Sequence, residues 1–130
     1  MPAQVDFDTV PQLFRRLCAR YGGRERTVLR YKERGEGWHD ITWEQLEDRA
    51  QALGGVLHRS GVRKGDRVAL LSENRPEWAV TDLGTQLVGG VNVSVYPSLP
   101  PAKVAYILRD SGATACVVSV PVQRKKIQEI

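Results

Sequence analysis

Three short apolar segments, separated by helical patterns of similar length, constrain the fold of this chain more than any other feature. They span residues 67–71, 91–96 and 115–120, so each begins 24 residues after the one before. Helical patterns follow them from residue 74, from residue 101 and from residue 121. Strands that alternate with helices in this way form parallel sheets with right-handed crossovers. The sequence therefore predicts an α/β fold with a three-stranded parallel βαβαβα sheet.

The region before this unit predicts two helices and a β-hairpin. A helix over 9–21 and another over 42–60 each begin with a capping box, Thr9 with Gln12 and Thr42 with Gln45. Between them, residues 27–31 and 38–41 are rich in β-forming side chains and are joined by a charged, glycine-containing turn. We therefore divide residues 1–130 into a helix–hairpin–helix lead-in, 1–61, and a parallel α/β unit, 62–130.

Two local features of the helices lead to specific expectations. Asn74 precedes Pro76 and Glu77, which favours Asn74 as the cap of the helix that starts there. Gly54 and Gly55 lie inside the helix over 42–60, where each costs about 1 kcal/mol relative to alanine. That cost suggests that another element packs closely against the helix at this point.

Composition excludes several classes of protein. The net charge is +4, from 19 Lys and Arg against 15 Asp and Glu, and the two signs are interspersed, which argues against a nucleic-acid-binding domain. The compact basic cluster 124–126 is interpreted as a solvated helix face. No apolar run approaches the roughly 20 residues of a transmembrane helix. Without a secretory signal at the N-terminus, we expect a cytoplasmic protein, with peripheral membrane contact left open.

The cysteines and histidines offer no metal or catalytic pattern. Cys18 and Cys116 are far apart in the sequence and lie in no zinc-ligand spacing, so both are predicted to be buried apolar residues. His39 and His58 are isolated and are predicted to have structural roles. We therefore predict no catalytic residue and no metal ligand in this chain.

Ligand chemistry is expected where parallel strands end, because open α/β sheets bind ligands beyond the carboxyl ends of their strands. Here those ends are 72–74, 96–99 and 120–121, and none contains a glycine. Neither GxGxxG nor GxxxxGK[ST] occurs in the chain. Phosphate cradles need glycines so that backbone amides can approach the ligand. The sequence thus predicts no cofactor-binding residue for this stretch.

Several motifs, in order along the chain, resemble the AMP-forming acyl-CoA synthetases. The strongest is 65–78, GDRVALLSENRPEW, and it is supported by 41–46, ITWEQL, 89–91, GGV, 95–100, VYPSLP, and 104–111, VAYILRDS. The resemblance covers nearly the whole chain and is greatest to the long-chain fatty acid ligases. No single motif is catalytic, but their order and spacing together are specific.

This resemblance implies a function for a longer enzyme and a fragment role for this chain. Such enzymes couple a carboxylic acid to ATP and then transfer the acyl group from AMP to CoA, which implies ATP, Mg and CoA as cofactors. Their phosphate loop and catalytic lysine would lie after Ile130. We therefore expect an N-terminal subdomain that is inactive alone, whose partners are the remainder of the ligase domain and a carboxylic, fatty acid substrate.

The resemblance also gives three strand-end positions, Tyr96, Pro97 and Ser98, that would lie near the side where CoA approaches in some members. Some relatives have a basic residue about there, where this chain has Ser98. A stand-alone α/β binding or interaction module without catalysis remains the alternative to a ligase fragment.

Overall fold

A three-stranded parallel sheet forms the centre of the molecule. The structure is a computed structural model that describes residues 6–23 and 25–130. Strands β3 (Arg67–Leu71), β4 (Val91–Val95) and β5 (Ala115–Val118) pair in the order β4-β3-β5, with Ala69 opposite both Val93 and Cys116. The predicted α/β class and parallel sheet are therefore confirmed. β4 and β5 end slightly before the predicted bounds, because residues 96 and 119 already turn toward the next helix.

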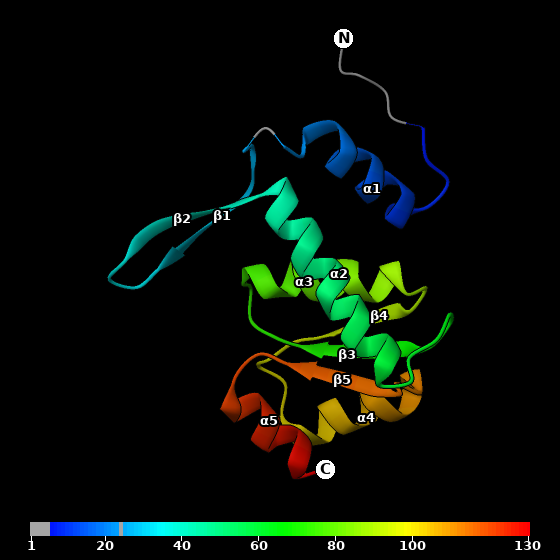
Figure 1. Ribbon diagram of the computed structural model, residues 1–130. Coiled ribbons are helices and arrows are strands. Elements are labelled where there is room, and N and C mark those ends of the chain that lie inside the picture. The colour runs from blue at the N-terminus through cyan, green and yellow to red at the C-terminus, as the bar shows by residue number, and fades with distance from the viewer. Residues whose placement is uncertain (1–5, 24) are drawn as a thin grey trace.

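Helices cover both faces of this sheet, as Figure 1 shows. Helices α2 (Trp43–Arg59) and α3 (Pro76–Leu87) lie on one face, and α4 (Pro101–Ser111) and α5 (Pro121–Gln128) lie on the other. The side chains of β3 alternate between the two sides, so that Val68 packs toward Leu57 of α2, whereas Ala69 and Leu71 pack toward Val104 of α4. A strand buried on both faces has to be apolar throughout, which explains the uninterrupted run Val68–Leu71.

The lead-in forms a second core on top of α2 and α3. Helix α1 (Val10–Tyr21) and the antiparallel hairpin of β1 (Thr27–Glu33) and β2 (Gly37–Thr42) pack there around Phe14, Ile41 and Leu46. The hairpin extends away from the sheet (Figure 1), and its strands are longer than the predicted ones because the charged residues 32 and 33 continue the ladder. No helix in the described part of the chain combines the length and apolarity needed to cross a membrane.

Of the three predicted helix starts, one is confirmed in full, one in part, and one is wrong. The Thr42–Gln45 capping box is complete, with both hydrogen bonds formed. At α1, Thr9 caps the amide of Gln12, but the Gln12 side chain accepts from Asp8 instead of Thr9. The expectation of Asn74 as a cap is wrong: Pro76 is the first helical residue, so Arg75 occupies the cap position and makes no side-chain cap bond.

The burial predicted for Cys18 is confirmed, whereas the expectations for Cys116 and Lys126 are wrong. Cys18 is buried, and burial raises the pKa of its thiol to about 11. Cys116, in contrast, is exposed on the edge strand β5, although partial burial of its thiol still raises its pKa. In the basic cluster, Arg124 and Lys125 are exposed as expected, but Lys126 is half-buried and hydrogen-bonded.

Candidate functional site

The carboxyl ends of the three strands open two crevices, because neighbouring strands continue in opposite directions. β3 continues into α3 on one face of the sheet, whereas β4 and β5 continue into α4 and α5 on the other face. Such a reversal leaves a gap between strand ends, where α/β proteins bind their ligands. Here an open crevice of about 550 Å³ lies between the ends of β3 and β4, and one of about 140 Å³ lies between β3 and β5.

Polar and aromatic side chains line the larger crevice, which we call the β3/β4 crevice. Its lining consists of Ser72, Glu73, Asn74, Trp78, Ser94, Val95, Tyr96 and Pro97. Of the three strand-end positions given by the resemblance, Tyr96 and Pro97 contribute to this wall and Ser98 is exposed next to them. Tyr96 is 77% exposed, so its ring is available to a ligand or to a further segment of protein. A role for these residues in CoA binding stays a prediction.

Glu73, at the end of β3, holds the only ionisable carboxyl in this lining. Its carboxylate accepts hydrogen bonds from Ser119 at the end of β5 and from Gln123 Nε2 of α5, the latter at 2.8 Å. The Ser119 hydroxyl is the main reason that the pKa of Glu73 lies below its ordinary value, with the Glu73 backbone and Gln123 adding to the effect. The crevice therefore carries a stable negative charge at neutral pH.

Helix α5 contacts the ends of all three strands. Buried Gln123 bonds to Glu73 and lies 3.4 Å from the carbonyl oxygen of Pro97, at the end of β4. Lys126 Nζ donates to the carbonyl oxygens of Pro97 at 2.6 Å and Leu99 at 2.8 Å. Lys126 therefore does not lie on the solvated helix face that the sequence predicts, and no sequence pattern predicts a role for Gln123. Only the i, i+3 spacing of these two residues indicated a shared helix face.

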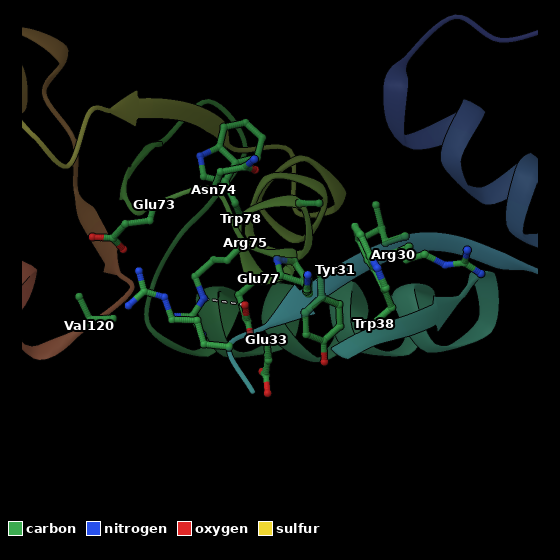
Figure 2. Close-up of a pocket in the computed structure, with 15 residues that line it drawn as sticks. Arg30, Tyr31, Glu33, Trp38, Glu73, Asn74, Arg75, Glu77, Trp78 and Val120 are labelled. Atoms are coloured by element: carbon green, nitrogen blue, oxygen red, sulfur yellow. Dashed lines mark hydrogen bonds and ion pairs between the residues drawn. The ribbon is translucent and has the colours of Figure 1, made fainter. Parts of the chain in front are cut away.

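A wider groove of about 1210 Å³ separates the hairpin from the start of α3 (Figure 2). One wall is formed by β1 and β2, with Tyr31 and Trp38, and the other by residues 73–79. Arg75 Nε donates to Glu77 Oε2 at 2.8 Å, and this hydrogen bond raises the pKa of Arg75 and lowers that of Glu77. Trp38 is 66% exposed, so the hairpin side of the groove presents apolar surface.

Three side chains that could bind a metal gather at the hairpin tip, although no sequence pattern predicts a metal site there. Candidate ligand atoms of Glu33, Glu36 and His39 all lie within 4.8 Å of one another. Both glutamates are exposed, and His39 stacks on Tyr31 with ring centroids 5.3 Å apart. Since exposed carboxylates often gather without an ion, this geometry alone does not make a metal centre.

His58, the other histidine, lies in the last turn of α2, where the helix dipole favours positive charge. This position agrees with the structural role predicted for it.

The sequence of residues 14–130 matches the family described as AMP-binding enzyme. The chain belongs to the AMP-binding enzyme family. Among its relatives, the long-chain-fatty-acid–CoA ligase of Escherichia coli O6:H1 is 32% identical over 124 residues, covering 90% of this chain and 21% of the relative. The long-chain-fatty-acid–CoA ligase ACSBG1 of Rattus norvegicus is 29% identical over 122 residues, covering 94% of this chain and 16% of the relative.

Solved structures agree with this membership of the AMP-binding enzyme family. The acyl-CoA synthetase of Brucella canis superposes with a TM-score of 0.84 at 26% identity, over 100% of this chain and 23% of that one. The N-terminal subdomain of Klebsiella oxytoca NpsA in complex with anthranilyl-AMSN superposes with a TM-score of 0.77 at 26% identity, over 87% of this chain and 28% of that one. The chain thus spans about a fifth of the length of the curated relatives it matches.

Proposed function

We propose that this chain forms the N-terminal part of an ATP-dependent acyl-CoA synthetase, which adenylates a carboxylic acid and then passes the acyl group from AMP to the thiol of CoA. The observation that carries the proposal is the family match over residues 14–130, together with a fold that superposes over the whole chain on the Brucella canis acyl-CoA synthetase. The names of the relatives favour a long-chain fatty acid as the substrate.

The chemistry of the β3/β4 crevice favours a supporting, non-catalytic role for this part of the enzyme. Adenylation needs preorganised positive charge or backbone amides where the phosphates develop charge. The β3/β4 crevice offers the Glu73 carboxylate instead, and no glycine lies among its lining residues. These residues do not fit the phosphates of ATP. In the proposed enzyme, the groups that bind ATP and Mg come from segments beyond this stretch, and the present residues form a wall of the domain.

Carboxylate-dependent exchange of pyrophosphate into ATP tests this proposal. The 130-residue chain alone should give no exchange with palmitate. A chimaera in which residues 14–130 replace the matched segment of the Escherichia coli ligase should give palmitate-dependent exchange, with benzoate as the control substrate. Exchange by the purified chain alone would overturn the supporting role. A chimaera that unfolds cooperatively like its parent but lacks exchange would overturn the assignment to this reaction.

A further inference from the structure

Buried Gln123 connects three segments that are distant in the sequence. Only 5% of its surface is exposed, and its Nε2 contacts Glu73 Oε1 at 2.8 Å and the Pro97 oxygen at 3.4 Å. Both partners are acceptors, so the side-chain amide has to present its nitrogen to them. Glu73 in turn accepts from Ser119. One amide group therefore links α5 to the ends of β3 and β4, and through Glu73 to the end of β5.

Lys126 lies one turn further along α5 and contacts the same strand end at shorter distances, 2.6 and 2.8 Å. Its ammonium donates to two backbone carbonyls, those of Pro97 and Leu99, and makes no ion pair among the described residues. A half-buried ammonium needs acceptors to replace the water it has lost. Since hydrogen bonds from charged donors are stronger than neutral ones, these two contacts should dominate the attachment of α5 to residues 97–99.

The composition of this turn explains why it needs donors from another element. Residues 97, 100 and 101 are prolines, which have no N–H, so the turn makes few hydrogen bonds of its own. Within it, the amide of Leu99 donates to the Tyr96 oxygen at 3.2 Å. Helix α4 does not use the oxygens of Pro97 and Leu99, because its first bonds go to Pro100. Lys126 therefore supplies partners that the turn lacks.

We propose that Gln123 and Lys126 form a clamp that fixes the 96–99 turn and thereby sets one wall of the β3/β4 crevice. Tyr96 and Pro97 lie in that wall, and Glu73, which Gln123 also holds, lies in the opposite one. The clamp is a positioning device of α5, and it does not depend on the adenylation chemistry proposed above. Loosening it should free the turn while the strands keep their pairing.

Hydrogen exchange of single amides, followed by mass spectrometry at concentrations where the 130-residue chain is monomeric, tests the clamp. Lys126→Met keeps the aliphatic stem but removes both bonds to the turn. Because hydrogen bonds to charged groups are stronger than neutral ones, the Leu99 amide should exchange at least about tenfold faster, which corresponds to about 1.4 kcal/mol. The Leu70 amide in β3 should keep its protection. Lys125→Met is the matched control, since Lys125 is exposed on the same helix and forms no side-chain hydrogen bond among the described residues.

Two further variants make the result decisive. Lys126→Arg retains charged donors and should keep Leu99 exchange near the parent rate. Gln123→Leu keeps the burial of α5 but removes the link to Glu73, and should accelerate Leu99 less than Lys126→Met because its contact with Pro97 is longer. Equal Leu99 exchange in Lys126→Met and Lys125→Met would overturn the clamp. So would an acceleration that is the same at Leu70 as at Leu99, since the effect would then be global unfolding.

Discussion

At the scale of single residues, the short polar contacts between strand ends are the features with clear pH consequences. Glu73 has a lowered pKa in the folded chain, first because Ser119 donates to it and also because of the Glu73 backbone and Gln123. A carboxyl whose pKa is lower in the folded state stabilises the fold at pH values above its unfolded pKa. That contribution disappears as the pH falls through the folded pKa.

Ser119→Ala should therefore destabilise the chain at neutral pH and have less effect in acid. We expect a loss of about 1 kcal/mol at pH 7, because a bond to a charged group is weakened by the partial exposure of Glu73. The difference from the parent should shrink below pH of about 4, near the ordinary pKa of a glutamate. Urea unfolding between pH 7 and pH 3.5 measures this, with exposed Ser98→Ala as control. A difference that stays constant over this range would show that the Ser119 bond does not act through the Glu73 carboxylate.

Sequence reasoning reached the place of this site but not its contacts. The rule that parallel strands bind ligands at their carboxyl ends located 72–74 and 96–99, and the structure brings 72–74 together with Tyr96 and Pro97 in one crevice. The bonds from Ser119 and Gln123 to Glu73 join residues 46 and 50 positions apart. No local pattern encodes such a separation, so Gln123 and Lys126 could be recognised only after the packing of α5 was known.

At the scale of elements, a sequence signal predicted the structure correctly where all the residues that form the contact are neighbours in the chain. The Thr42–Gln45 capping box involves only neighbouring residues, and it formed as predicted. Asn74 was misassigned because two local preferences competed there: proline favours the first helical position, and placing Pro76 there moves the cap to Arg75. The close packing predicted at Gly54 and Gly55 is confirmed for Gly54 only. Gly54 meets the backbone of Gly84 in α3, whereas Gly55 faces only the side chain of Arg59 in its own helix.

Gly84→Ala and Gly55→Ala should have opposite effects on stability. A Cβ at Gly84 would lie 2.8 Å from the Ala50 oxygen and 3.2 Å from the Gly54 nitrogen, so α2 and α3 would have to separate. Overpacking of this kind costs about 1–3 kcal/mol. At Gly55 the nearest atom is the flexible end of Arg59, at 3.3 Å, and alanine should add up to about 1 kcal/mol through helix propensity. Thermal and urea unfolding of both variants measure the contrast, and a Gly84→Ala protein as stable as the parent would show that the helices are not in close contact.

At the scale of the whole molecule, the central sheet has two edge strands, β4 and β5. In the described residues β4 and β5 each pair on one side only, with β3, so each leaves a row of backbone donors and acceptors free. Parallel sheets ordinarily contain more than three strands and are covered on both faces. Large apolar side chains are exposed on β4 or next to it, Val91 at 50% and Tyr96 at 77%. Both edges are therefore available for pairing with a further strand.

The 130-residue chain alone should consequently self-associate, and charges placed on its edge strands should prevent it. Unpaired edges join to one another unless charged side chains or covering elements block them. Val91 and Cys116 are exposed on β4 and β5, so lysine can replace each without entering the core. We expect the parent chain to grow in apparent mass with concentration in light scattering under reducing conditions, and Val91→Lys/Cys116→Lys to stay monomeric. Val56→Lys, at an exposed apolar position on helix α2 and not on an edge strand, is the control and should associate like the parent. A parent chain that remains a monomer at every concentration would mean that its edges are already protected, and would favour a stand-alone module over a subdomain that pairs with more of the ligase.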